Sequence, residues 1–182
     1  MTRRSLTVEE LYDLLWASDE AFRIEALQDY AVMGEDDAER RRAFFEGRPV
    51  PESDTKGKRI IGEVVAAGKV LQRVHVVDLP LTPYLQFEVT VYPENVAAGE
   101  DVRIADRAKH PGLAELTEDF LLFDGDTDQA VAVLFRYTPD GVNLGWDRSD
   151  DPDDIARCRA QRDLAWAHAV PLEEFRTSLG TG

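Results

Sequence analysis

Val70-Leu71-Gln72-Arg73-Val74-His75-Val76-Val77 is the stretch of sequence that decides the fold. It has the length of a strand and is rich in β-branched residues, which favour extended structure. A second apolar segment, Val102-Arg103-Ile104, follows some 25 residues later and also predicts a strand. The conformation of the chain between these two strands determines whether they pair as parallel or antiparallel neighbours.

The connecting residues 83–98 carry signals for two structures. Thr82 is a good helix N-cap, Pro83 suits the first helical position, and Gly99 stands where a helix would end. Alternating apolar residues leave a strand as the alternative, and Pro93 opposes the interior of either element. We predict a helix, so that strand, crossover helix and strand form a βαβ unit with parallel pairing.

Outside this unit the sequence predicts flanking helices and a β-meander. Thr7 and Glu10 have the spacing of a capping box, which predicts a helix from Val8. Around Phe22 and Ile24 the apolar period drops to two, and the stretch through Tyr30 and Val32 is predicted to be either a strand or an extended strap. Two apolar runs predict strands over residues 120–123 and 130–135, and the Pro-Asp-Gly turn that follows predicts a third strand over residues 142–146. An Asp-Pro pair predicts the start of the last long helix, over residues 152–169.

The predicted fold class is mixed α/β, with the βαβ unit and the meander in one sheet packed by N-terminal and C-terminal helices. We expect a single domain over residues 1–182. Within it, residues 1–50 form an N-terminal helical and extended subregion, residues 54–150 the α/β core, and residues 151–180 the C-terminal helices.

Charge restricts the classes of partner. The 182 residues contain 21 Lys and Arg against 36 Asp and Glu, for a formal net charge of −15. This balance argues against ordinary nucleic-acid binding, which depends on Lys and Arg, and against an anionic membrane surface. No apolar stretch has the length of a signal region or a membrane span, so we expect a cytoplasmic protein.

The charge is unevenly distributed along the chain. Residues 117–154 contain 11 acidic residues and 2 arginines, whereas residues 56–73 carry a local net charge of +4. The acidic segment predicts a docking face for a protein partner with a basic surface. We take Asp150, Asp151, Asp153 and Asp154 as its interaction candidates.

Motifs for known chemistry are incomplete. Cys158 is the only cysteine, and no His-x-x-x-His pair is present, so we expect no metal site. Asp124, Asp126 and Asp128 match the start of a calcium loop, but Gln129 stands where the loop needs glycine. Dinucleotide and P-loop patterns and a nucleophile elbow are absent, so no cofactor and no catalytic residue is predicted.

The alternative prediction is a ligand site at the strand ends of the βαβ unit. If its strand ends line a site, Arg73, His75, Tyr84, Glu88 and Arg103 would converge there and would suit a phosphorylated ligand. The competing interpretation of His75 is a partly buried structural imidazole.

Several segments together resemble a family of uncharacterised actinobacterial proteins, over about residues 6–175. The resemblance implies a domain of unknown function whose members are often encoded beside helix-turn-helix regulators, and it carries no established activity. It rests on Ala21-Phe22-Arg23-Ile24-Glu25, Arg73-Val74-His75-Val76-Val77 with Pro80-Leu81 and Tyr84, residues 95–101, Asp119-Phe120-Leu121-Leu122-Phe123-Asp124 and Leu164-Ala165-Trp166.

A weaker similarity concerns topology. A basic strand, a helix, a second strand and a hairpin that begins Phe-Asp-Gly are similar to half of a phospholipase-D-like domain, but that domain's His-x-Lys pair is missing.

The first functional hypothesis is a non-enzymatic regulatory or protein-interaction protein that acts with a transcription regulator. The alternative is an enzyme or small-molecule binder for a phosphorylated ligand, with a degenerate phosphodiesterase-like site.

Overall fold

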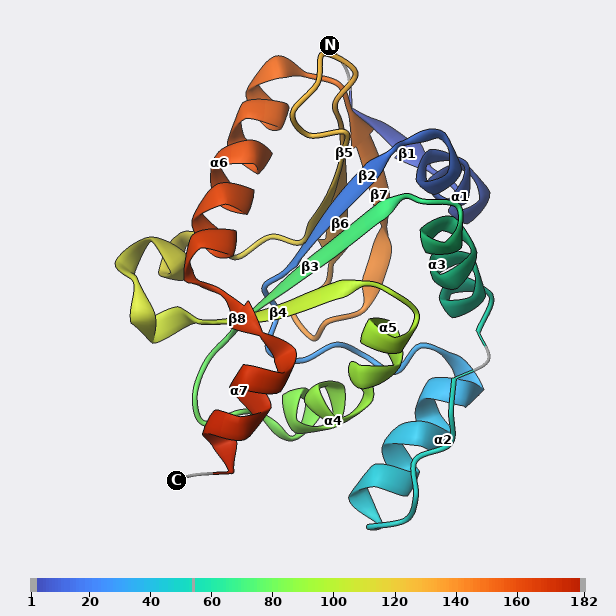
Figure 1. Cartoon of the computed structure of the whole chain (residues 1–182), viewed down its shortest axis with the longest axis vertical. Helices are drawn as coiled ribbons and strands as arrows, with labels where there is room; N and C mark the ends of the chain where they lie inside the picture. The colour runs from blue at the N-terminus through green and yellow to red at the C-terminus, as the bar shows by residue number, and fades with distance from the viewer. Residues whose placement is uncertain (1–2, 54, 181–182) are drawn as a thin grey trace.

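A mixed sheet organises the chain in the computed structural model, which describes residues 3–53 and 55–180. Over these residues the sheet has eight strands in the order β1-β7-β6-β5-β2-β3-β4-β8 (Figure 1). The strands are β1 (Arg4–Leu6), β2 (Glu20–Glu25), β3 (Val70–Val77), β4 (Asp101–Asp106), β5 (Phe120–Phe123), β6 (Val131–Tyr137), β7 (Asn143–Ser149) and β8 (Val170–Pro171).

The βαβ prediction is confirmed. Strands β3 and β4 pair in parallel, and residues 83–98 are helical rather than extended. Pro93 divides this segment into α4 (Pro83–Val91) and α5 (Pro93–Ala97), because proline has no N–H for the helix ladder and its ring collides with the preceding turn. Thr82 caps α4 through its side-chain oxygen, which accepts a hydrogen bond from the Leu85 amide at 3.1 Å.

The meander and the βαβ unit form one sheet, as predicted, because β2 lies between them. It pairs in parallel with β3 and antiparallel with β5. The period of two around Phe22 therefore marks a central strand, which ends at Glu25, and the chain from residue 26 to residue 33 forms neither strand nor helix. Phe22 and Ile24 are buried on one face of this strand, and Arg23 between them points to the other face.

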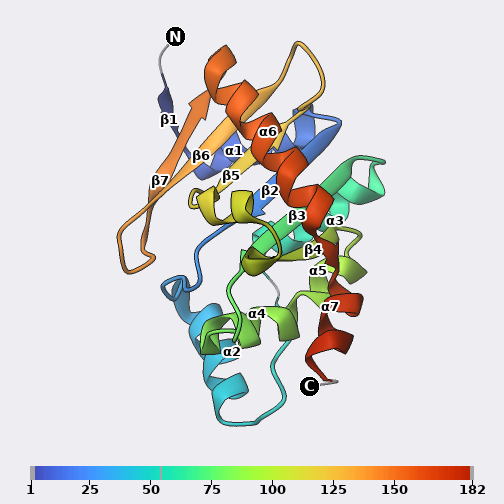
Figure 2. The same cartoon turned by 90° about the vertical axis from the view of Figure 1, so that its left-hand side faces the viewer.

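Helices cover both faces of the sheet (Figure 2). The long helix α6 (Pro152–His168) lies on one face, where Ile155, Cys158 and Ala165 pack against Phe22 and Phe120. The opposite face is covered by α1 (Val8–Ala17) and α3 (Lys56–Ala66) towards one end and by α4 and α7 (Leu172–Leu179) towards the other. Helix α2 (Gly34–Phe45) and two short 3-10 helices, Arg107–Lys109 and Pro111–Glu115, complete the described fold.

Two apolar clusters on the α1 side of the sheet are separated along β3. Leu71 belongs to the cluster under α1 and α3, and Val77 belongs to the cluster under α4 and α7. Arg73 and His75 lie between them on the same face, because side chains of a strand alternate. The sheet therefore presents polar groups at the junction of two apolar cores.

No helix among the described residues is long and apolar enough to cross a bilayer.

Candidate functional site

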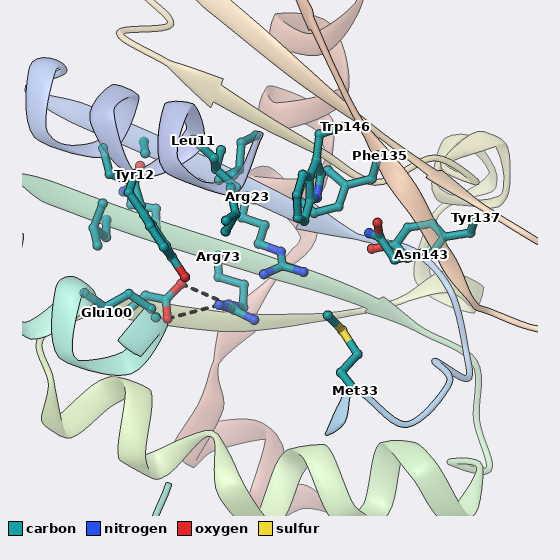
Figure 3. Close-up of a pocket in the computed structure, with 18 residues that line it drawn as sticks. Leu11, Tyr12, Arg23, Met33, Arg73, Glu100, Phe135, Tyr137, Asn143 and Trp146 are labelled. Atoms are coloured by element: carbon teal, nitrogen blue, oxygen red, sulfur yellow. Dashed lines mark hydrogen bonds and ion pairs between the residues drawn. The ribbon is translucent and has the colours of Figure 1, made fainter. Parts of the chain in front are cut away.

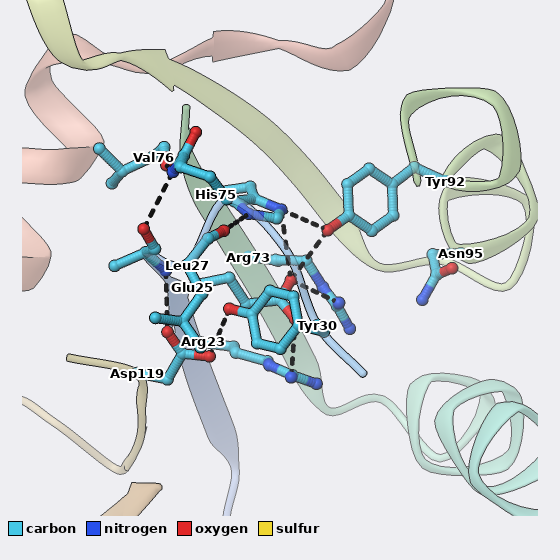
Figure 4. A network of polar contacts seen from close by, with 12 residues as sticks. Arg23, Glu25, Leu27, Tyr30, Arg73, His75, Val76, Tyr92, Asn95 and Asp119 are labelled. Carbon is cyan, nitrogen blue, oxygen red and sulfur yellow. Dashed lines mark hydrogen bonds and ion pairs between the residues drawn. The ribbon is translucent and has the colours of Figure 1, made fainter. Parts of the chain in front are cut away.

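Four polar side chains form a block on the two central parallel strands. In the β2–β3 register Arg23 lies opposite Arg73 and Glu25 lies opposite His75. Because paired residues of parallel strands point to the same face, all four side chains project from one side of the sheet (Figure 4). They lie between the two apolar clusters on that face. In the sequence these four residues form an Arg-x-Glu pattern in the apolar strand β2 and an Arg-x-His pattern in β3.

Ion pairs bind the block together and extend it to the start of β4. Arg23 Nη2 lies 2.7 Å from Glu25 Oε1, and Arg73 Nη1 donates to Glu25 Oε2 at 2.8 Å. Arg73 Nε also donates to Glu100 Oε1 at 2.9 Å, and Asn95 Nδ2 donates to Glu100 Oε2 at 2.7 Å. Each guanidinium therefore has a carboxylate partner inside the fold.

Gly99 places Glu100 against Arg73. It ends α5 with a φ of +98°, a backbone conformation that L side chains rarely adopt. A Cβ at this position would lie 2.4 Å from Cγ1 of Val65 on α3. Glycine thus allows the chain to turn sharply under α3 and to direct the next side chain into the block.

The charges of the block lower the pKa of one buried carboxyl group and raise the pKa values of two others. Burial by itself would raise the pKa of Glu25, but the neighbouring charges of Arg23 and Arg73 outweigh it and hold that pKa well below its usual range. Burial and the charge of Glu25 raise the pKa of Glu88 and of Asp119. Glu25 is therefore the carboxylate that the arginines keep ionised.

Hydrogen bonds fix the aromatic groups above the block. Tyr92 donates to Glu25 Oε2 at 2.9 Å, and its hydroxyl also lies 2.7 Å from His75 Nδ1. The other imidazole nitrogen of His75 lies 3.0 Å from the Leu27 carbonyl oxygen. Tyr30 donates to Asp119 Oδ2 at 2.5 Å. His75 is 1% exposed, which fits the structural interpretation of this residue.

A cavity of about 320 Å³ opens beside the arginine end of the block (Figure 3). Apolar side chains from α1, α3 and the strands form most of its wall, and Arg23, Arg73 and Glu100 form its polar end. Met33, which is 68% exposed, lies at its rim. The rest of the apolar and aromatic part of the wall comprises Val8, Leu11, Tyr12, Leu15, Ala21, Ile61, Leu71, Leu121, Phe135, Tyr137 and Trp146.

Two donor atoms of residues that line the cavity have no hydrogen-bond partner among the described residues. They are Arg23 Nε and Trp146 Nε1, and both atoms are shielded from solvent. A buried donor without an acceptor costs about 1–3 kcal/mol. Arg23 approaches the same wall with its guanidinium 5.2 Å from the centre of the Phe135 ring.

The predicted ligand residues are only partly brought together. Arg73 lines the cavity, and His75 lies behind Arg73 in the block. Tyr84 and Glu88 belong to α4 and interact with each other beside Glu25. Arg103 does not join them: it pairs in register with Val74 and therefore points to the α6 face, where its guanidinium lies 3.8 Å from the Trp166 ring centre.

Sequence reasoning missed most of the site, including Arg23, Glu25, Glu100 and Trp146. A signal for the first two was present, because a charged pair at alternate positions of an otherwise apolar strand repeats the Arg-x-His pattern of residues 73–75. Glu100 and Trp146 come from other parts of the chain, and nothing local in the sequence assigns them to this place.

The predicted interaction candidates differ from one another in exposure. Asp150 and Asp153 are exposed, and Asp151 caps α6 by accepting from the Asp153 amide at 3.0 Å. Asp154 is only 8% exposed. It accepts from the side chains of Arg3 at 2.7 and 3.0 Å, Ser149 at 2.7 Å and Arg157 at 3.0 Å.

Asp154→Asn is expected to lower the free energy of unfolding by about 1–3 kcal/mol, because three donors lose a charged acceptor. The hydrogen bonds from Arg3 hold the pKa of Asp154 well below its usual range, so this contribution is present at neutral pH and is lost as the pH falls below about 4. Urea unfolding at pH 7 and pH 3 measures both effects. Asp150→Asn, at an exposed position, is the control, and equal stability of the two variants would contradict a structural role for Asp154.

Within residues 3–53 and 55–180, no group of three or more His, Cys, Asp or Glu side chains is placed to hold a metal ion.

Comparison with curated proteins finds no match. The model of one family, a domain of unknown function designated DUF6879, matches residues 8–177. This range contains the central strands, the buried polar cluster and every residue that lines the cavity. Because the match spans nearly the whole sequence, the chain belongs to the DUF6879 family.

Proposed function

We propose that this protein is a non-enzymatic regulatory protein that binds a small, largely apolar molecule in the cavity between α1, α3 and the sheet. The observation that carries the proposal is an apolar and aromatic cavity of about 320 Å³ with arginines at one end. This volume lies within the range of small-molecule sites, which combine a mainly apolar wall with a few polar groups that fix orientation.

The arrangement of the polar cluster favours binding over chemistry. His75 and Tyr92 can transfer protons, but they lie behind Arg73 and bond to Leu27 and Glu25. Arg73, the residue best suited to a phosphorylated ligand, already bonds to two carboxylates. A phosphate would have to displace one of them, so we do not favour the phosphodiesterase-like alternative.

For the regulatory part of the proposal, the partner is a protein with a basic surface, such as a transcription regulator. Its support is the acidic segment 117–154, of which Asp150 and Asp153 remain exposed in the fold. Opposite charges on two surfaces mainly raise the association rate.

A neutral apolar dye, N-phenyl-1-naphthylamine, tests the cavity through its fluorescence in a binding titration. Leu121→Trp places an indole inside the cavity, because Leu121 points from β5 into its wall. We expect this variant to bind the dye at least about tenfold more weakly than the natural sequence. Leu144→Trp is the matched control, since Leu144 is 54% exposed on β7 and lies outside the cavity.

Ile61→Trp fills the cavity from α3 and repeats the test from the opposite wall if Leu121→Trp unfolds. Dye binding that both filling variants retain, or an absence of dye binding to the natural sequence, would overturn the proposal.

A further inference from the structure

We infer that the ligand of this cavity is an uncharged molecule with an aromatic body and one hydrogen-bond acceptor, such as an aryl ketone, received by Arg23 and Trp146. The inference rests on the proposed function, because it names the class of molecule that the cavity takes. Three independent features of the wall support it: the unpartnered groups are donors, the charges at the polar end are balanced, and the remaining wall is aromatic and aliphatic.

The first feature defines the polar group of the ligand as an acceptor. The two wall atoms without a described partner, Arg23 Nε and Trp146 Nε1, both carry a hydrogen and have no accepting lone pair. Glu100, the carboxylate at the same end, already accepts hydrogen bonds from Arg73 and Asn95. A ligand oxygen therefore gains bonds that the protein leaves unmade, whereas a ligand N–H would share the oxygens of Glu100 with Arg73 and Asn95.

The second feature excludes a net charge on that group. Two guanidinium groups, Arg23 and Arg73, lie against two carboxylates, Glu25 and Glu100. The charges of these ion pairs cancel. An anionic ligand would add an uncompensated negative charge beside Glu100 in a largely apolar cavity, which is unfavourable without a further cation. A carbonyl oxygen satisfies the donors at no such cost.

The third feature gives the shape and character of the rest of the ligand. In Figure 3 the arginine ends lie between Tyr12 on one side and Phe135 with Trp146 on the other. Phe135 and Trp146 pack edge to face, with ring centres 6.2 Å apart. Aromatic walls pack favourably against a planar ring, by stacking or by edge contacts. The aliphatic side chains of α1 and α3 enclose the rest.

Three probes of nearly the same size and shape test the inference: 2-acetylnaphthalene, 2-isopropenylnaphthalene and 2-naphthoate. Only the first offers a neutral oxygen acceptor, the second offers none, and the third is an anion. Competition with N-phenyl-1-naphthylamine gives their affinities. We expect the ketone to bind about tenfold more tightly than either analogue.

Two variants test the residues that receive the acceptor. Arg23→Met is expected to abolish the preference for the ketone over the hydrocarbon while the hydrocarbon still binds. Arg136→Met, an arginine on β6 outside the cavity, is the matched control and should keep the preference. If Arg23→Met does not fold, Trp146→Phe removes the indole N–H, keeps an aromatic ring, and should reduce the preference.

The outcomes separate this inference from the proposed function. Binding of the naphthoate as tight as that of the ketone overturns the uncharged class, and equal binding of ketone and hydrocarbon overturns the acceptor. Either result leaves the cavity as a binding site. If both Arg23→Met and Trp146→Phe keep the preference for the ketone over the hydrocarbon, Arg23 and Trp146 are not the donors that bind the acceptor. Failure of the dye and of all three probes to bind overturns the proposed function itself.

Discussion

Glu25→Gln is expected to lower the free energy of unfolding by about 3–5 kcal/mol. Glu25 is 5% exposed and accepts from Arg73 and Tyr92 while pairing with Arg23. Glutamine keeps the shape but removes the charge, so Arg23 loses the carboxylate to which it is bonded inside the fold. Breaking a buried ion pair is costly because the remaining charge stays desolvated. Equilibrium unfolding in urea at pH 7 measures the change.

An acid titration of stability gives a second readout of the same residue. The folded-state pKa of Glu25 lies well below the ordinary value of 4.5, so the unfolded chain takes up the proton first as the pH falls. The stabilisation is therefore present above about pH 4.5 and declines below it, and Glu25→Gln should show a smaller acid-induced loss than the natural sequence. Glu52→Gln, at an exposed loop position, is the control. A loss below about 1 kcal/mol for Glu25→Gln would contradict this account of the cluster.

Phe120→Ala is expected to cost about 3–5 kcal/mol of folding free energy. Phe120 begins β5 with no exposed surface and packs with Phe22 at a ring-centre distance of 6.4 Å. It lies opposite Ile24 on β2 and Leu134 on β6, so it connects the parallel half of the sheet to the meander. Truncation removes buried apolar area and leaves a cavity under α6.

Thermal and urea unfolding of Phe120→Ala should both move to milder conditions. Phe45→Ala is the comparison, because Phe45 is 57% exposed at the end of α2 and its removal should change stability by well under half as much. If the two truncations cost the same, the core between the sheet and α6 does not hold the two halves of the sheet together.

Local sequence was sufficient to predict the βαβ unit. The start of α4 was readable because Thr82 as N-cap and Pro83 at the first helical position act within one turn of helix, and these signals outweighed the alternating apolar residues that favoured a strand. The break at Pro93 has the same local origin, since proline lacks the donor that a continuous helix needs. Residues 120–123 and 131–137 were recognisable as strands for a similar reason: their apolar runs are bounded by turn residues.

The partners of these strands could not be read in the same way. The placement of β2 between β3 and β5 depends on contacts between residues about 50 and 100 positions apart, and no local preference encodes them. Arg73 and His75 were predicted as site residues from their strand alone. Their partners Glu25 and Glu100 were missed, because it is strand register and the turn at Gly99 that direct those carboxylates to them.

Arg103 illustrates the limit of grouping residues by sequence proximity. It is in the same βαβ unit as Arg73, yet the β3–β4 register aligns it with Val74, on the opposite face. A shift of one residue in strand register moves a side chain to the other face of the sheet. The number of residues in a crossover helix does not determine that register.

The sequence by itself determined the class of fold, the βαβ unit and the strands of the meander, because helix caps, turn residues and apolar periodicity act over a few neighbouring residues. Only the tertiary structure decided that Arg23, Glu25, Arg73 and Glu100 meet beside an apolar cavity. The physical reason is that buried charges are stable only with partners, and those partners are brought into place by strand pairing between segments distant in sequence.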